Sequence, residues 1–101
     1  MPASLHLFGT SHSWQTFVDG VAAHERVHAR YIVDMVGEIE KATVGLAVAD
    51  DPQCQKIRRQ MQPVLGEISR AERQKQRDFD RTEFSDGGNV HQLILQLVNG
   101  P

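Results

Sequence analysis

Hydrophobic residues recur every three or four positions over a long stretch of this sequence. The stretch covers residues 13–49, and its face consists of Trp14, Phe17, Val18, Val21, Ile32, Val36, Ile39, Thr43 and Leu46. This spacing places the side chains on one side of an α-helix. We therefore predict one long amphipathic helix over residues 13–49, with Ser13 as its N-cap.

A second helix is predicted after a turn formed by Asp50, Asp51 and Pro52. Asp51 is a suitable helix cap, and proline is favoured at the first helical position. Pro63 predicts a kink in this helix. Its hydrophobic face consists of Cys54, Ile57, Met61, Leu65, Ile68, Ala71 and Phe79. The sequence thus predicts a mainly α fold, a long antiparallel helical hairpin that forms a single domain of residues 1–101.

The two ends of the chain are less regular. The glycine-rich residues 85–89 predict a loop, after which Val90–Val98 form a short closing segment that fits a helix or a strand equally poorly. Residues 3–10 alternate loosely between leucine and polar side chains, which favours a short strand or an extended arm.

Composition excludes some classes of partner. With 11 Lys and Arg against 13 Asp and Glu, the net charge is −2, so we expect no binding to nucleic acid. The apolar runs are far shorter than the roughly 20 residues of a membrane-spanning helix, so we expect no membrane insertion. Residues 1–7 lack the basic and apolar regions of a signal peptide. The oligomeric state stays open.

The first helix carries a His-Glu-x-x-His motif formed by His24, Glu25 and His28. Histidines four residues apart project from the same side of a helix, where they can share one metal ion. Catalytic zinc sites use three protein ligands and leave a position open for water, and a glutamate beside the first histidine can act as general base. Because Glu25 and His28 follow the face of Val21 and Ile32, we expect the motif to face the interior or a cleft. The alternatives are an exposed helix face or a hydrogen-bonded core network without metal.

A third zinc ligand has to come from another segment. If the turn centres on the two aspartates, Arg77 and Arg73 lie opposite the two histidines. The acidic residues near that level are Glu72, Asp78 and Asp80. We favour Asp80 as the ligand, although each of the three is also consistent with a solvated charge. His91 is a further candidate, because the closing segment could fold back over the site.

The chain resembles a family of bacterial predicted secreted zinc-dependent proteases whose domain has no assigned function. The resemblance covers residues 14–88 and rests on Trp14, the His24-Glu25-Arg26-Val27-His28 motif, the Asp51-Pro52-Gln53-Cys54 stretch and the Phe79-Asp80-Arg81-Thr82 segment. The family continues its second helix into an aromatic-Asp-x-x-Thr-x-His-Gly motif, whereas Glu83 and Phe84 follow Thr82 here. The N-terminal β portion of the family is missing or reduced to residues 1–12. The chain therefore resembles a minimal or degenerate member.

The resemblance implies a zincin-like metallopeptidase that uses Zn²⁺ to polarise the scissile carbonyl. Glu25 would take a proton from the attacking water, while His24, His28 and the third ligand hold the metal. The implied substrate is a peptide or protein, short peptides and peptidoglycan cross-links included, and the implied location is periplasmic or secreted. Two alternatives stay open: a helical-hairpin interaction module, and a metal-binding regulator without hydrolytic activity.

Overall fold

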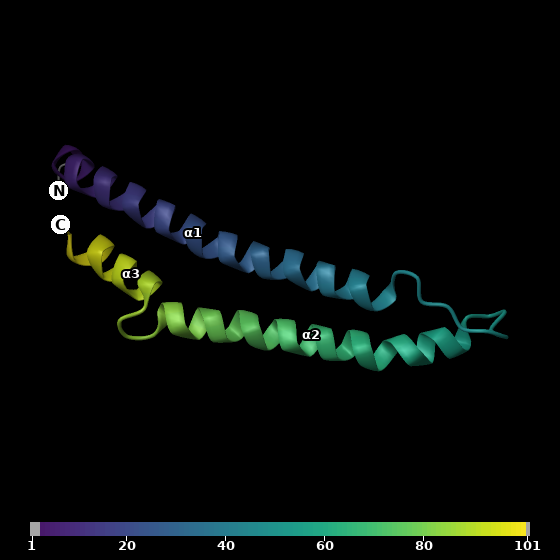
Figure 1. The fold of residues 1–101 in the computed structure, drawn as a ribbon. Helices are drawn as coiled ribbons and strands as arrows, with labels where there is room; N and C mark the ends of the chain where they lie inside the picture. The colour runs from purple at the N-terminus through teal and green to yellow at the C-terminus, as the bar shows by residue number, and fades with distance from the viewer. Residues whose placement is uncertain (1–2, 101) are drawn as a thin grey trace. The chain divides into compact units, whose positions relative to one another are not determined.

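The computed structural model contains three α-helices and describes the backbone of residues 3–100 and the side chains of residues 12–100. Helix α1 spans Ala3–Thr43, α2 spans Gln55–Phe84 and α3 spans Asn89–Asn99 (Figure 1). Residues 3–100 contain no β-strand, so the mainly helical class predicted from the sequence is confirmed. Among these residues, none of the helices combines the length and the apolar character needed to cross a bilayer.

Helix α1 begins and ends earlier than its sequence pattern predicts. Ser13 lies inside the helix and does not cap it, and the strand or arm expected at residues 3–10 is instead the first part of α1. This segment contains no proline after position 2, and its alanine and leucines favour a helix. At the other end, α1 stops at Thr43 and does not reach Ala49. Gly45 follows with a φ of 82°, a left-handed conformation that ends helices.

The start of α2 confirms one expectation and corrects another. The Asp51 carboxylate accepts hydrogen bonds from the backbone N–H groups of Lys56 and Ile57, at 3.0 and 2.9 Å, so it caps the helix as predicted. The bond from Lys56 is the main reason that the pKa of Asp51 is lowered from its ordinary value. Pro52, however, lies in the preceding turn, since the helix begins only at Gln55. Pro63 lies inside α2, which continues on both sides of it.

The chain divides into two compact units, each built from paired stretches of α1 and α2. The first unit contains Met1–His28 and Asp78–Pro101, and the second contains Ala29–Arg77. In the first unit, the beginning of α1 runs beside the end of α2 and beside α3 (Figure 1). In the second unit, the end of α1 pairs with the beginning of α2. The pairing within each unit is antiparallel, as a helical hairpin requires.

The first unit has an interior that contains both polar and apolar side chains. Val90 of α3 is its buried hydrophobic residue, while His24 and Glu83 are buried polar residues. Helix α3 is amphipathic and packs closely against α1. The two helices approach so closely that a Cβ atom added at Gly20 would lie 2.2 Å from Cδ1 of Leu93. Of the two alternatives left open for Val90–Val98, a helix or a strand, the structure shows the helix.

The covered face of α1 in the first unit differs in part from the hydrophobic face predicted for it. Its covered positions include Phe17, Val21, His24 and His28, at the alternating spacing of three and four that paired helices share. Trp14 was placed on the same face, yet it is 54% exposed. The prediction was wrong here because it followed hydrophobicity alone, whereas the contact line between the two helices passes through both histidines.

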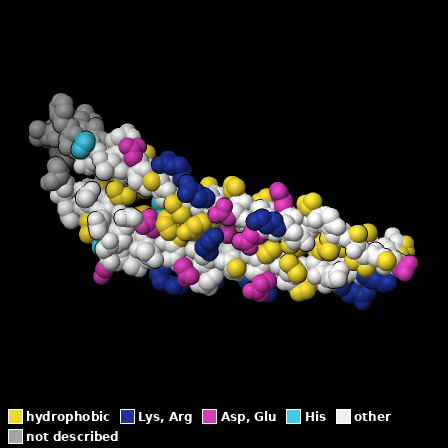
Figure 2. Space-filling view, in the orientation of Figure 1, with side chains coloured by type: hydrophobic (Ala, Val, Ile, Leu, Met, Phe, Trp, Pro, Cys, Tyr) yellow, Lys and Arg dark blue, Asp and Glu magenta, His cyan; other side chains and the backbone are white. Residues whose placement is uncertain are grey.

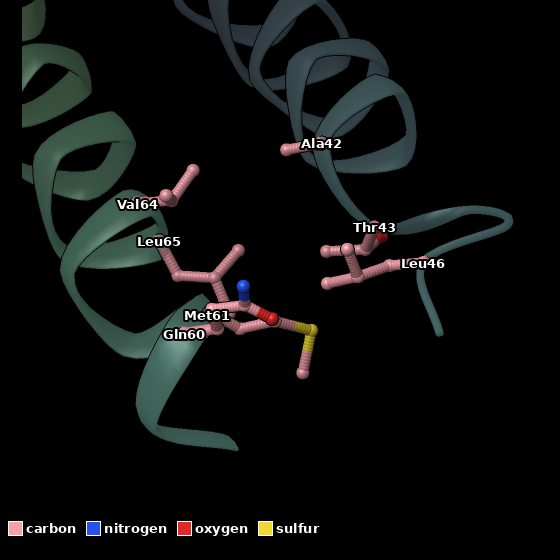
Figure 3. Close-up of a pocket in the computed structure, with 7 residues that line it drawn as sticks. All are labelled: Ala42, Thr43, Leu46, Gln60, Met61, Val64 and Leu65. Carbon is pink, nitrogen blue, oxygen red and sulfur yellow. The ribbon is translucent and has the colours of Figure 1, made fainter. Parts of the chain in front are cut away.

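The second unit leaves much of its hydrophobic surface uncovered. Ile32 and Val36, which the sequence placed on the packed face, are 49% and 45% exposed. Figure 2 shows hydrophobic side chains at the surface among charged ones. Figure 3 shows a pocket of about 220 Å³ where the end of α1 meets the start of α2. It is lined by Ala42, Thr43, Leu46, Gln60, Met61, Val64 and Leu65.

Candidate metal centre

Three potential metal ligands converge in the first unit. Nε2 of His24, Nε2 of His28 and Oδ1 of Asp80 all lie within 4.8 Å of one another. The two Nε2 atoms are 3.0 Å apart, and Oδ1 of Asp80 is 2.9 Å from His24 and 2.6 Å from His28. We call these residues the metal cluster. Asp80, the acidic residue favoured from the sequence, is thus the one that lies against both histidines.

The donor atoms of the metal cluster fit zinc in kind, and their separations are somewhat shorter than a zinc site requires. Two imidazoles and one carboxylate are a common set of ligands for catalytic zinc. Bonds of about 2.0–2.1 Å in a tetrahedral site place neighbouring ligand atoms roughly 3.3 Å apart. The three atoms here are slightly closer together than that, so small outward movements of the side chains would open the space for an ion.

A fourth side chain contacts His24 from the opposite side of its ring. Oε1 of Glu83 lies 3.2 Å from Nδ1 of His24, and both side chains are buried. When Glu83 accepts the Nδ1 proton, the Nε2 atom of neutral His24 carries a lone pair. That lone pair faces a carboxylate oxygen of Asp80 at hydrogen-bond distance. A cation, or a proton carried by His24 or by Asp80, would have to lie between these two acceptors.

Aromatic rings surround the histidines. The Phe79 ring stacks on His24 with centroids 4.6 Å apart and an angle of 18°, and it meets His28 edge to face at 5.2 Å. Phe84 approaches His24 at 5.6 Å in an edge-to-face arrangement. These contacts restrict rotation of the His24 ring, so its two nitrogens keep their separate partners. Asp80 is more open, with a side chain that is 50% exposed.

Glu25 lies in a different environment from the one predicted. The sequence placed it on the buried face, but the structure leaves it exposed while His24 beside it is 5% exposed. The reason is the helical rotation of about 100° between successive residues: once His24 faces α2, Glu25 turns to solvent. Its carboxylate is therefore accessible to water on the same helical turn as the histidines.

The other candidate ligands have different partners. Asp78 accepts a hydrogen bond from Arg81 at 3.2 Å, and Glu72, in the second unit, accepts one from Gln76 at 2.7 Å. Nδ1 of His91 accepts a bond from the backbone N–H of Gly87 at 3.2 Å. None of these three candidates belongs to the metal cluster.

The predicted pairing of the two helices was shifted along α2. His24 lies opposite Asp80 and Glu83, not opposite Arg77, because the turn does not centre on the two aspartates. Sequence reasoning also missed Glu83. Its position, four residues after Phe79 on the hydrophobic face of α2, is the pattern that could have identified it as a covered residue.

Comparison with known proteins places the chain in a family. The model of a family of bacterial proteins of unknown function, DUF922, matches residues 6–88. The chain belongs to this family. The DUF922 region includes every residue of the metal cluster, Glu25 and Glu83, and it ends just before α3. The predicted resemblance is thereby confirmed at the level of a bacterial family without an assigned function. No curated protein and no solved structure shows a significant match to the chain.

Proposed function

We propose that this DUF922 protein is a zinc-dependent metallopeptidase that hydrolyses a peptide bond with water. The observation that carries the proposal is the convergence of His24, His28 and Asp80 on one point, with Glu25 beside the first histidine on the same helix. Metal-assisted hydrolysis needs such a set of groups, namely three ligands and a general base.

Each residue has a distinct role in this proposal. His24, His28 and Asp80 hold the ion, and the half-exposed carboxylate of Asp80 leaves this part of the metal cluster open to solvent. Bound zinc supplies a Lewis acid for the scissile carbonyl and the attacking water. Glu25 accepts a proton from that water and returns it to the leaving amine. Its exposure supports this role, because a general base has to reach solvent-derived water.

Zinc content of the purified protein is the first test. We expect about one equivalent in the native chain, and its loss in His24→Ala, His28→Ala and Asp80→Ala. His12→Ala is the matched control, because His12 is an exposed histidine of α1 outside the metal cluster. A native chain that takes up no zinc after reconstitution would contradict the proposal.

Hydrolysis of a broad mixture of fluorogenic peptides is the second test. Glu25→Gln should keep zinc and lower the rate by about 10²–10⁴, the usual contribution of a general base. Glu38→Gln, an exposed glutamate of the same helix, should change neither property. Bound zinc without hydrolysis in the native protein would instead favour the metal-binding regulator.

A second candidate function is a helical interaction module. It is favoured by large hydrophobic side chains at the surface, such as Val33 and Val44, which are 69% and 78% exposed. Exposed hydrophobic side chains commonly mark contacts with another protein where they gather into a continuous patch. If the protein is a helical interaction module, the His24→Ala and His28→Ala proteins should keep full biological activity. If it is a peptidase, both substitutions should abolish that activity.

A further inference from the structure

We propose that Glu83 is a positioning residue for the metal centre, which it serves by fixing the orientation and the proton of His24. The inference rests on the proposed function, because it assigns Glu83 a role toward the zinc that the cluster would hold. Glu83 does not itself belong to the group of converging ligands. Its effect on the metal is therefore exerted through His24.

The geometry separates the two nitrogens of the His24 ring. Nδ1 faces Glu83 at 3.2 Å, and Nε2 faces Asp80 at 2.9 Å. Both carboxylates come from α2, where Glu83 follows Asp80 by three residues, about one helical turn. A single imidazole therefore lies between two successive turns of the partner helix, with one nitrogen for each turn.

Burial makes the contact with Glu83 difficult to replace. Glu83 is 7% exposed and His24 is 5% exposed, so neither side chain can exchange its partner freely for water. A buried carboxylate without a hydrogen bond is strongly unfavourable, and Nδ1–H of His24 is the donor that lies against this one. In the described part of the chain, no buried side-chain nitrogen or oxygen atom lacks a partner.

The chemical consequence concerns the other nitrogen. A proton held on Nδ1 leaves the lone pair on Nε2, which is the atom that points into the metal cluster. Hydrogen bonding from a metal-ligating histidine to a carboxylate also makes the ligating nitrogen more basic. Since Phe79 stacks on the ring face, the imidazole is held in this orientation before any ion arrives.

Zinc affinity of Glu83 variants tests the inference. We expect Glu83→Leu to bind zinc about 10- to 100-fold more weakly than the native chain, the effect typical of losing such an outer hydrogen bond. Glu72→Leu is the matched control, because Glu72 lies on the same helix but belongs to the second unit and not to the metal cluster. Far-UV circular dichroism of each variant reports whether the helices are retained.

A spectroscopic measurement separates positioning from mere support of the fold. In zinc-loaded protein with ¹⁵N-labelled histidine, Nδ1 of His24 should carry a proton with the downfield resonance of a hydrogen bond to a carboxylate. Glu83→Gln keeps the shape of the side chain but not its charge, so it should move this resonance upfield and leave the His28 signals in place. This variant also serves if Glu83→Leu fails to fold.

The outcomes are distinguishable. Suppose that the native protein binds zinc and that the Glu83 variants keep both its zinc affinity and its His24 resonance. This result would overturn the role of Glu83 but would not contradict the metal centre. Native protein that binds no zinc would overturn the proposed function and this inference with it. The positioning role of Glu83 would be established by three results together. Glu83→Leu binds zinc more weakly, Glu83→Gln moves the Nδ1 resonance of His24 upfield, and Glu72→Leu binds zinc like the native chain.

Discussion

Nε2 of His28 lies 2.6 Å from Oδ1 of Asp80, although 52 residues separate them in the chain. Nε2 of His24 contacts the same oxygen atom, and the two contacts join α1 to α2 inside the first unit. The metal cluster therefore forms only when the two helices have paired. An ion bound by these residues would therefore couple helix pairing to the stability of the first unit.

Loss of the carboxylate ligand should nearly abolish zinc binding. Asp80→Asn keeps the shape of the side chain but removes the anionic oxygen, so we expect zinc affinity to fall by more than about 100-fold, beyond the effect of outer residues. Competition with a chromogenic chelator measures the change. Asp78→Asn is the control, because Asp78 is exposed and pairs with Arg81; equal losses in the two variants would count against Asp80 as a ligand.

Zinc should raise the melting temperature of the native protein. A ligand that binds only the folded state at a free concentration 100 times its dissociation constant adds about 2.7 kcal/mol to the free energy of unfolding. Thermal unfolding followed by circular dichroism, with zinc and then with excess chelator, measures this shift. His28→Ala should melt at the same temperature in both conditions, and a zinc-dependent shift in that variant would contradict the assignment of His28.

His24 and Glu83 should be energetically coupled in the metal-free protein. His24→Leu leaves the Glu83 carboxylate buried without its partner, so we expect a loss of about 1–3 kcal/mol in the free energy of unfolding. Adding Glu83→Leu to this variant should restore part of the loss, because both polar groups are then gone. Urea unfolding in the presence of chelator measures the coupling, and additive effects of the two substitutions would contradict it.

The cap of α2 predicts a pH dependence of stability. The pKa of Asp51 is lowered in the folded protein, chiefly by the hydrogen bond from the backbone of Lys56. The stabilisation is therefore fully present above the ordinary value of 3.8 and is lost as the pH falls through the lowered folded value.

Comparison of the native chain with Asp51→Ala measures this effect. The difference in their urea midpoints should be largest above the ordinary pKa of Asp51 and should shrink in more acidic solution. Asp50→Asn, which removes the neighbouring charge, is the control and should follow the native pH profile. A difference between the native chain and Asp51→Ala that grows on acidification would contradict the capping role.

The loop between α2 and α3 should not tolerate a side chain at Gly88. A Cβ atom there would lie 2.2 Å from the carbonyl oxygen of Thr82 and 2.4 Å from that of Glu83, and these backbone atoms cannot move aside easily. We expect Gly88→Ala to lower the free energy of unfolding by about 1–3 kcal/mol, as overpacking does. Gly37→Ala, inside α1 with open space around it, should instead add about 0.5–1 kcal/mol.

The helical class and part of the metal cluster could be predicted from the sequence because they depend on local patterns. His24 and His28 share a helix, so their spacing alone brings the two rings together. The α2 cap at Asp51 is equally local. The helix boundaries were less predictable, because α1 continues through Ser13, which was expected to cap it.

What the sequence could not give was the alignment of one helix against the other. The approach of Asp80 and Glu83 to His24 depends on how the connection between the helices is built, and a shift of a few residues changes every cross-helix pair. The exposure of Glu25 also follows from the alignment of the two helices, because that alignment turns His24 toward α2. A hydrophobic pattern predicts which residues avoid water, but in α1 polar histidines occupy the contact line and several valines do not.

The polar interior of the first unit also determines which helix alignment the chain can adopt. Paired helices with uniformly apolar contact lines can slide by one heptad and pack nearly as well, whereas a buried polar group at such a position specifies one register. Displacing α2 along α1 would leave His24 and Glu83 enclosed among apolar neighbours, each without its partner. The buried pair of His24 and Glu83 thus excludes the shifted pairings, so substitutions that made this interior uniformly hydrophobic would leave the alignment of the two helices less certain.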